Sequence, residues 1–501
     1  MKGRHESRKL GVGAAALWLL LPLLVLVVLK TDFLPQVAQF SEARFNKVAD
    51  QMAHKVSYFG LDGARWQQKP VDVAKPDAAG ENSQQESQIL ASNGAKDSSL
   101  VNSDVAAAPI ITSELTCNFS NYHSDFCTMQ GDLRIHGKAA MVYVVSATTY
   151  RPENSTIRVR PYARKWEQGT MSRIREVTMR SSPPNANDII PPRCTAAHDV
   201  PAVVFSTGVY HGNYYHSMSD MVIPLYLTAR AYGGRVQLLV SGYEPEWVAK
   251  YRPILAALSV YPVIDLDADA EVRCFPAAQV GLESHRNLGV DEGRSRGGHT
   301  MEGFMDFLRS TFSLPRPVST PVSRSAGRKK PRLVLVLRRH SRALTNEDDA
   351  VAAVREVGFD VVAAGPEEAQ DMAAFAGVVN SCDVMVGVHG AGLTNMVFLP
   401  RNATLVQIIP WGNMKWPCWY DFGEPAPGMG LRYVEYEATA EETTLKDKYG
   451  KDHPVFADPL SIHRKGFGQI WLYFLNGQNV TLDIDRFRGA MQEVYNSITI
   501  E

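Results

Sequence analysis

Three observations predict an α/β protein whose globular part has two lobes. Residues 332–410 alternate apolar strands with helices on short connections, which is typical of a parallel, doubly wound sheet. A second α/β pattern runs through residues 202–240 and indicates a second lobe. Between the two patterns, residues 316–330 are basic and rich in Pro and Ser, so we interpret this charge run as a solvated hinge rather than a binding patch.

The elements of the C-terminal pattern follow from its apolar runs and helix signals. The first strand, residues 333–337, reads Leu-Val-Leu-Val-Leu, as expected for a strand buried on both faces. A helix follows, with Asn346 as its cap, acidic residues in its first turn and Gly358 at its end. Further strands are expected at residues 359–364, 383–388 and 404–409, and a further helix at residues 367–382.

Glycines and arginines gather at the carboxyl edge of this predicted sheet. The third strand runs directly into His-Gly-Ala-Gly-Leu-Thr-Asn, residues 389–395. Gly390 and Gly392 let the backbone approach a ligand closely, and the next helix directs its N–H groups and positive end to the same place. Arginines after the first strand, among them Arg339 and Arg342, can clamp phosphate oxygens at that edge. A glycine loop alone is equally typical of a tight turn, but loop and arginines together predict a site for a nucleotide diphosphate.

The N-terminal pattern carries a second group of chemical residues, His211, His216 and Asp220, in a turn and helix. His216 and Asp220 are four residues apart, so they share one helix face. Such a pair can deprotonate a hydroxyl group. The alternative is structural, with Asp220 as a hydrogen-bonding acid and His216 as a partly buried histidine.

Length and charge restrict the class of protein. The chain has 501 residues and a formal net charge of -1. The length corresponds to about three domains. The near-neutral charge argues against a polyanion binder, so no nucleic-acid partner is expected.

A membrane anchor is predicted at residues 10–29, an apolar, uncharged stretch long enough to cross a bilayer. Basic residues cluster before it and only Lys30 follows closely, so residues 1–9 should stay cytosolic and the bulk of the chain should face the lumen. A cleaved secretory signal is the alternative, but no small-residue cleavage pattern follows the stretch. Residues 30–109 are expected to form a stem whose polar second half cannot bury enough surface to fold.

Glycosylation sequons and cysteines agree with a lumenal location. The four acceptor asparagines are Asn118, Asn154, Asn402 and Asn479. All six cysteines lie beyond the predicted anchor, and Cys117 with Cys127 is the easiest pair to close. The other four cysteines allow three connectivities, and their scattered spacing fits no zinc motif.

Taken in order along the chain, these motifs resemble those of plant glycosyltransferase family 61. The matching stretches are residues 117–120 with Cys127, 131–136, 212–216 with Asp220, 274–275 with 280–282, 338–346 and 387–395. The resemblance covers residues 117–477. It implies two Rossmann-like lobes in the GT-B arrangement, inversion at the anomeric carbon, and a single-pass type II Golgi membrane protein that uses a UDP-sugar. In grasses, similar members of the family decorate xylan with arabinofuranosyl or xylosyl groups.

The resemblance also implies roles for individual residues. The donor-binding set is Arg339, Arg342, Asn346, His389, Gly390, Ala391, Gly392, Thr394 and Asn395. Inversion needs a base on the acceptor side, and we expect Asp220 to take the proton, with His216 orienting it and His389 as the competing base. No metal is expected to be required. An aromatic group after the fourth strand forms either a stacking floor for sugar rings or buried packing: Trp411, Trp416, Trp419 and Tyr420.

The expected function is pentosyl transfer from a UDP-pentose to xylan. The expected segments are a tail (1–9), an anchor (10–29), a stem (30–109), an acceptor lobe (110–325), a UDP-sugar lobe (326–480) and a C-terminal helix (481–501). Ser217 stands where many similar sequences have an acid, so we expect β-1,2-xylosyl transfer to the xylan backbone, with α-1,3-arabinofuranosyl transfer as the alternative. A complex with other Golgi xylan enzymes is a further option.

Two other functions compete with this one. The sequence Asp-Leu-Asp-Ala-Asp, residues 265–269, follows a short apolar run in the manner of the metal-binding acids of a GT-A enzyme. The other competitor is a non-catalytic lumenal binding or scaffold protein, which would bind donor or glycan without turnover.

Overall fold

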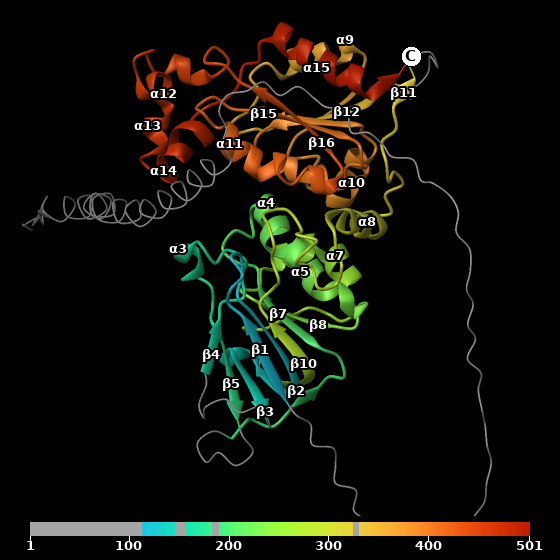
Figure 1. The fold of residues 1–501 in the computed structure, drawn as a ribbon, viewed down its shortest axis with the longest axis vertical. Coiled ribbons are helices and arrows are strands. Elements are labelled where there is room, and N and C mark those ends of the chain that lie inside the picture. The colour runs from blue at the N-terminus through green and yellow to red at the C-terminus, as the bar shows by residue number, and fades with distance from the viewer. Residues whose placement is uncertain (1–112, 146–155, 183–189, 324–329, 501) are drawn as a thin grey trace, which may run out of the picture. The chain divides into compact units, whose positions relative to one another are not determined.

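The computed structural model describes residues 113–145, 156–182, 190–323 and 330–500, whose strands form two main sheets (Figure 1). The predicted tail, anchor and stem lie outside the described residues, as does the sequon at Asn154. Among the helices of the described ranges, none has the length and apolar character that a membrane crossing needs.

The C-terminal sheet is the parallel sheet that the sequence predicts. Its neighbouring strands all run in the same direction, in the order β13-β12-β14-β15-β16. The strands are β12 (Arg332–Val336), β13 (Asp360–Ala364), β14 (Val384–Val388), β15 (Thr404–Ile409) and β16 (Arg432–Glu437). The first four correspond to the four apolar runs, because a strand covered on both faces needs apolar side chains at every position.

Helices cover both faces of this sheet. In Figure 1, α9 (Glu347–Val357) and α15 (Ile484–Ile498) lie above it, and α10 (Met372–Asn380) lies below. Leu333 and Leu335 belong to the core beneath α9 and α15, whereas Val334 and Val336 belong to the core that contains α10. This alternation is the period of two of an extended strand. Helix α10 is shorter than the predicted 367–382, because Asp371 caps it by accepting from the backbone N–H groups of residues 373 and 374.

The strand order creates a switch point between β12 and β14. After β12 the chain adds β13 on one side, and it then crosses to the other side to add β14. At such a point the two loops that leave neighbouring strands diverge, and ligands of open α/β sheets bind in the crevice at the carboxyl ends of the strands. The loops in question are the arginine segment after β12 and the His-Gly-Ala-Gly segment after β14.

The N-terminal sheet is mixed, so this half is not Rossmann-like throughout. Its order is β4-β5-β3-β2-β10-β7-β8-β9, with β1 on β2 and β6 on β10. Strands β10, β7, β8 and β9 are parallel, whereas β1, β3 and β10 each pair antiparallel with β2. The strands are β1 (Glu114–Asn118), β2 (Phe126–His136), β3 (Met141–Val145), β4 (Thr156–Val159), β5 (Val177–Ser182), β6 (Ala196–Ala197), β7 (Ala202–Ser206), β8 (Gln237–Ser241), β9 (Ile264–Asp265) and β10 (Val272–Val280).

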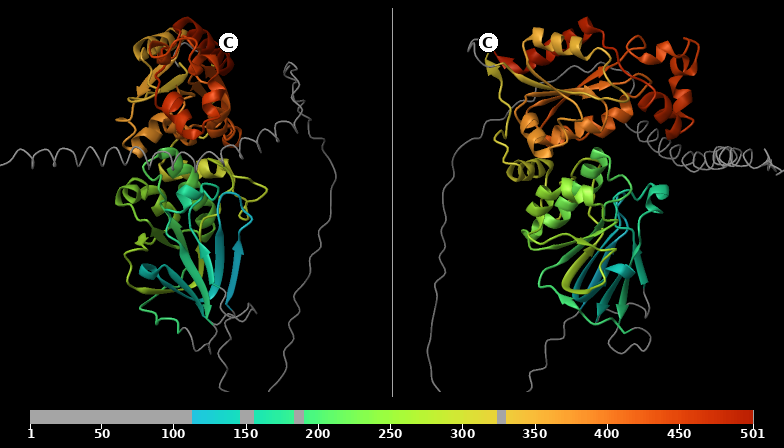
Figure 2. Two further views of the ribbon diagram at one scale, coloured as in Figure 1. Left: turned by 90° about the vertical axis from the view of Figure 1, so that its left-hand side faces the viewer. Right: turned by 180° about the vertical axis from the view of Figure 1, so that it is seen from behind.

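The helices of this half lie on one face of the parallel strands (Figures 1 and 2). Val203 and Phe205 of β7 pack with these helices, whereas Ala202 and Val204 pack with side chains of the antiparallel strands. The predicted helix after β7 is interrupted by a wide π-helical turn. Its parts are α4 (Tyr214–His216), the turn η3 (Ser217–Val222) and α5 (Ile223–Ala229), followed later by α7 (Arg252–Leu258) and α8 (Met301–Thr311). Turns of this kind are rare and frequent at functional sites.

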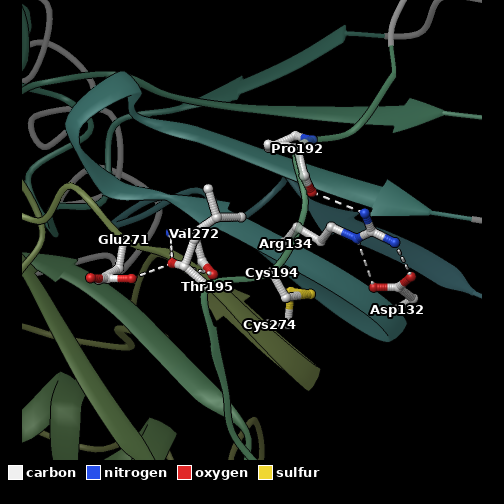
Figure 3. The surroundings of a disulfide bond; sticks show 8 residues. All are labelled: Asp132, Arg134, Pro192, Cys194, Thr195, Glu271, Val272 and Cys274. Carbon is white, nitrogen blue, oxygen red and sulfur yellow. Dashed lines mark hydrogen bonds and ion pairs between the residues drawn. A yellow bond between two sulfur atoms is a disulfide. The ribbon is translucent and has the colours of Figure 1, made fainter.

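Two disulfides lie in the N-terminal half. Cys117 and Cys127 are bonded, as the sequence predicts, and join β1 to β2. The second bond joins Cys194 to Cys274 of β10. Figure 3 shows the Arg134–Asp132 ion pair beside it, with Arg134 also donating to the carbonyl of Pro192 at 2.9 Å. The remaining two cysteines, Cys382 and Cys418, are buried free thiols.

A buried aspartate fastens the linker between the halves to the C-terminal sheet. Asp383, which is 4% exposed, accepts from the backbone N–H of Arg332 at 2.9 Å and from the Ser319 hydroxyl at 2.8 Å. It also pairs with Arg316 at 2.5 Å. These bonds join the linker to the starts of β12 and β14.

We expect Asp383→Ala to destabilise the protein by about 3 kcal/mol, because it leaves the donors around a buried charge without their partner. Asp360→Ala is the matched control, since Asp360 pairs with Arg332 at 3.5 Å but is 62% exposed, and its loss should cost less than about 1 kcal/mol. Urea unfolding midpoints of both variants measure the difference. Equal midpoints would contradict the role of Asp383.

Candidate functional site

Two arginines at the switch point form no ion pair with any carboxylate of the described residues. Arg342 is 6% exposed and donates from Nη1 to the carbonyl of His389 at 3.1 Å, while Arg338 donates from Nε to the carbonyl of Ser341 at 2.7 Å. Neither forms an ion pair with a carboxylate in the described part of the chain. Burial, together with the charge of Arg338, lowers the pKa of Arg342 to about 9. A buried cation normally has a counter-charge, so this arrangement points to an anionic ligand.

The loop after β14 closes around the same arginines. Gly390 has φ 152°, and a Cβ atom there would lie 2.2 Å from Nη1 of Arg338. Only glycine therefore allows the guanidinium group to lie against the backbone. Nε of Arg342 and the hydroxyl of Thr394 are buried without a hydrogen-bond partner among the described residues. Unsatisfied polar atoms of this kind are available to bond a polar ligand.

Other members of the predicted donor set have different neighbours. Arg339 pairs with Glu347 at 2.9 Å, and its side chain is 40% exposed. Asn346 precedes α9, but its side chain does not cap the helix and instead exchanges two hydrogen bonds with the backbone of Leu482. Asn346 is thus the N-cap residue of α9, as predicted, and its carbonyl accepts from the backbone N–H of Ala350, but its side chain forms no capping hydrogen bond. We take Arg338, Arg342 and the loop that contains Gly390 as the candidate anion-binding group and call these residues the anion pocket.

The rest of the loop after β14 also follows the predicted course. A short 3₁₀ helix, η5 (Ala391–Phe398), begins directly after Gly390. Within it, the Asn395 amide donates to the carbonyl of Gly392 at 2.9 Å, so this side chain supports the loop rather than pointing away from it.

His389 is held as a neutral imidazole behind this pocket. Its Nδ1 accepts from the Gln407 amide at 2.8 Å, and Gln407 in turn accepts from the Tyr433 hydroxyl at 2.6 Å. Burial, with the charges of Arg342 and Arg338, lowers the pKa of His389 to about 3. Its Nε2 lies 3.8 Å from the Asp421 carboxylate. His389 is therefore held in place at the start of the loop after β14, and its imidazole does not carry a charge at neutral pH.

Asp421 is the functional candidate that the sequence reasoning missed. It lies in a turn of the C-terminal half, η6 (Trp419–Gly423), and accepts from the Tyr215 hydroxyl of the N-terminal half at 3.2 Å. Desolvation raises the pKa of Asp421 to about 6, and the hydrogen bond from Tyr215 and the charge of Arg342 oppose the rise. The carboxylate thus lies within electrostatic reach of both the anion pocket and the His–Asp pair. Its only sequence signal is its position directly after the predicted aromatic group.

The predicted His–Asp pair is present. Nδ1 of His216 lies 2.9 Å from Oδ2 of Asp220. Asp220 is 2% exposed, and it also accepts from the Tyr162 hydroxyl at 3.0 Å and from Arg164 at 3.4 Å. We assign the ring proton of His216 to Nδ1, because its nearest neighbour is a carboxylate, which only accepts. Its Nε2 then carries a lone pair and has no partner among the described residues.

Two neighbours of the pair have other surroundings. His211 is 38% exposed and lies near the Glu244 carboxylate, at 4.0 Å. Ser217 is fully buried, donates to the carbonyl of His211 at 3.0 Å and accepts from the Trp247 indole at 3.2 Å. Ser217 is thus part of the packing behind the helix, so its replacement of an acid gives no reason to prefer one donor sugar over another.

The aromatic group after β15 divides into packing and surface residues. Trp411 donates to the carbonyl of Val455 and packs on Phe456. Trp416 is 48% exposed and stacks with Trp419 at 5.0 Å and with Tyr420 at 6.4 Å. These last three side chains form a partly exposed surface directly before Asp421.

The acidic turn at residues 265–269 is engaged by protein groups. Asp265 accepts from two backbone N–H groups of the turn, Asp267 pairs with Arg175 at 2.5 Å, and Asp269 pairs with Arg273 at 2.6 Å. No cluster of His, Cys, Asp and Glu suited to a metal ion occurs in the described ranges. The turn therefore has a structural explanation.

Comparisons with known proteins identify the family. The model of Glycosyltransferase 61 matches residues 214–406. Alpha-1,3-arabinosyltransferase XAT2 of Oryza sativa subsp. japonica is 41% identical over 383 residues, which are 76% of this chain and 64% of that protein. Beta-1,2-xylosyltransferase XYXT1 of the same species is 42% identical over 391 residues, 75% of this chain and 83% of that protein.

A third relative comes from another plant. The xylan glycosyltransferase MUCI21 of Arabidopsis thaliana is 34% identical over 395 residues, 76% of this chain and 79% of that protein. A solved heptosyltransferase, TibC, aligns with a TM-score of 0.25 at 9% identity over 66% of this chain and 84% of that one, a likeness too weak to bear on the fold. The chain spans just under two thirds of the first rice relative but most of the other two plant proteins. By this similarity the chain belongs to the glycosyltransferase 61 family.

Proposed function

We propose that this protein is an inverting glycosyltransferase that moves a pentose from a UDP-sugar to xylan. The observation that carries the proposal is the pair of arginines, Arg338 and Arg342, without a carboxylate partner in the described chain, at the switch point of a parallel sheet. The names of two rice relatives support the candidate reactions, which are β-1,2-xylosyl and α-1,3-arabinosyl transfer. The name of the Arabidopsis relative supports xylan as the acceptor. We retain β-1,2-xylosyl transfer as the first candidate, because this chain matches the xylosyltransferase XYXT1 over 83% of its length but the arabinosyltransferase XAT2 over 64%, and we keep α-1,3-arabinofuranosyl transfer as the second.

The role of the two arginines would be to stabilise the leaving group, UDP. In a displacement at the anomeric carbon, UDP departs with growing negative charge on its diphosphate. Preformed guanidinium groups and the Gly390 backbone would stabilise that charge most strongly in the transition state, because they need no reorganisation in a site of low polarity. In this proposal the protein neutralises the leaving group with its own cations, and no metal is required.

We assign the base to His216 and an orienting role to Asp220, which exchanges the roles expected from the sequence. Asp220 is only 2% exposed, its Oδ2 accepts from Tyr162, Arg164 and His216, and its Oδ1 lies 3.4 Å from the Arg164 guanidinium, so burial leaves this carboxylate poorly accessible to an acceptor. The Nε2 of His216 is the available lone pair. The acceptor hydroxyl would transfer its proton there as its oxygen bonds to the anomeric carbon and the bond to UDP breaks.

Asp421 completes the arrangement between the two halves. Its bond from Tyr215 and its approach to His389 fix the donor loop relative to the helix that bears His216. This shared contact supports the two-lobed GT-B arrangement as part of the proposal. The Golgi location, the type II anchor, N-glycosylation and association with other xylan enzymes are proposed from the sequence alone.

Measurements of UDP affinity should show that Arg338 and Arg342 bind the diphosphate and that Arg339 does not. Arg338→Ala and Arg342→Lys are each expected to weaken UDP binding about tenfold or more, since a charge-assisted hydrogen bond contributes about 1.5–3 kcal/mol and lysine lacks the planar fork. Arg339→Ala is the matched control, because Arg339 pairs with Glu347, and calorimetry should find its UDP affinity within about twofold of wild type. A large loss in Arg339→Ala with none in Arg338→Ala would move the anion pocket to the residue expected from the sequence.

The assignment of the base predicts chemical rescue. His216→Ala should lower kcat by about 10²- to 10⁴-fold, and added imidazole should restore part of it, because a diffusible base can occupy the vacated position. His211→Ala should stay near wild type, since His211 lies outside the pair. If imidazole fails to rescue while Asp220→Asn abolishes transfer, Asp220 is the base.

A donor screen tests the function itself. The full-length protein in detergent is given xylan oligosaccharides with UDP-xylose or UDP-arabinofuranose, and NMR determines the linkage of the product. We expect transfer of xylose with a β-1,2 linkage. Binding of donor or glycan without any transfer would support the non-catalytic alternative and overturn the proposal.

A further inference from the structure

A column of stacked planar groups leads from the surface to His216. Tyr122 lies flat on Trp166, with ring centroids 5.3 Å apart and planes inclined by 4°. The guanidinium of Arg164 lies 5.0 Å from the Trp166 ring on one side and 5.6 Å from the Tyr210 ring on the other. Tyr210 in turn stacks on His216 at 4.4 Å. The column thus ends at the proposed base.

Hydrogen bonds hold this column rigid. Arg164 pairs with both Glu167 and Asp220, and the Tyr210 hydroxyl donates to Glu167 at 3.2 Å. Trp166 is also packed edge-on by the buried ring of His123, at 5.0 Å. A rigid aromatic surface loses little conformational entropy when a ligand binds to it.

Tyr122 is the exposed end of the column. Although it is a large aromatic residue, it is 54% exposed, and one of its ring faces is backed by Trp166. Tyr420, from the exposed aromatic surface of the other half, lies within its electrostatic reach, because Tyr122 contributes to the raised pKa of the Tyr420 phenol after burial itself. Tyr122 of the N-terminal half and Tyr420 of the C-terminal half therefore lie near each other.

We propose that the open face of Tyr122, supported by Trp166, is a subsite for a sugar ring of the acceptor glycan. The inference rests on the proposed function and extends it to the acceptor. Sugar rings present apolar C–H faces that stack on aromatic rings, and the subsite would hold a part of the glycan that lies away from the reacting hydroxyl at His216. Binding energy gained there would position the hydroxyl without taking part in the chemistry.

The glycan of the protein's own sequon is the competing occupant. Asn118 lies four residues before Tyr122, and its side-chain amide oxygen, Oδ1, accepts from the hydroxyl of Ser120, the third residue of the sequon. A glycan attached at Asn118 would start only four positions before Tyr122, so its sugar rings could stack on the Tyr122 ring. Ser120→Ala removes the sequon and separates the two occupants.

The test compares acceptors of different length in the full-length protein. Tyr122→Ala should raise KM for long xylo-oligosaccharides about tenfold while leaving their kcat within about twofold, and the shortest accepted oligosaccharide should show no such rise. Tyr122→Phe should restore the wild-type KM because the ring face remains. Phe467→Ala, which removes a 51% exposed ring in the C-terminal half, is the control and should leave KM unchanged.

The outcomes separate this inference from the proposed function. An unchanged KM for long acceptors in Tyr122→Ala, or an equal rise for all lengths, overturns the subsite. A rise that disappears in the Ser120→Ala background also overturns it, because the sequon glycan then accounts for the effect. UDP affinity of each variant reports its folding. A wild-type protein that transfers sugar to no acceptor of any length contradicts the proposed function instead.

Discussion

The constraint on which this structure depends is positive charge at the carboxyl edge of the C-terminal sheet. Arg342 is almost completely buried beside Arg338, and the described chain supplies no carboxylate to pair with either. Such an arrangement is unfavourable in the empty protein, because burial and mutual repulsion both act against the charged forms. The glycine at position 390 allows the two groups to converge on one loop. An enzyme that must stabilise a departing diphosphate has a physical reason to retain this arrangement.

The two halves of the protein contact each other beside the residues that we propose to be functional. The N-terminal half contributes a His–Asp pair whose carboxylate is buried and whose imidazole presents one free nitrogen. The C-terminal half contributes the anion pocket. Asp421 connects them through a hydrogen bond from Tyr215, which lies 206 positions away in the sequence. Positioning of this kind supplies part of the rate enhancement of any bisubstrate enzyme.

Much of the C-terminal half could be predicted from the sequence, because buried parallel strands consist of apolar runs and the glycine loop follows one of them directly. The order of the strands, and with it the switch point, depends on pairings that local sequence does not encode. Arg338 and Arg339 are adjacent, and only the three-dimensional course of the loop decides that one faces the pocket and the other Glu347.

The N-terminal half was harder to predict, because its side-chain contacts join segments that lie far apart in the sequence. The spacing of His216 and Asp220 predicted their contact correctly. Their relative exposure depends on Tyr162 and Arg164, which lie 58 and 56 positions before Asp220. Asp421 had only a weak local signal, its position directly after the aromatic group, because its partner Tyr215 comes from a distant segment.

A crystal structure with bound UDP tests the central claim most directly. The account predicts density for the diphosphate within hydrogen-bonding distance of the guanidinium groups of Arg338 and Arg342 and of the backbone at Gly390. Density for UDP at another edge of the sheet, with both arginines still unpaired, would contradict it.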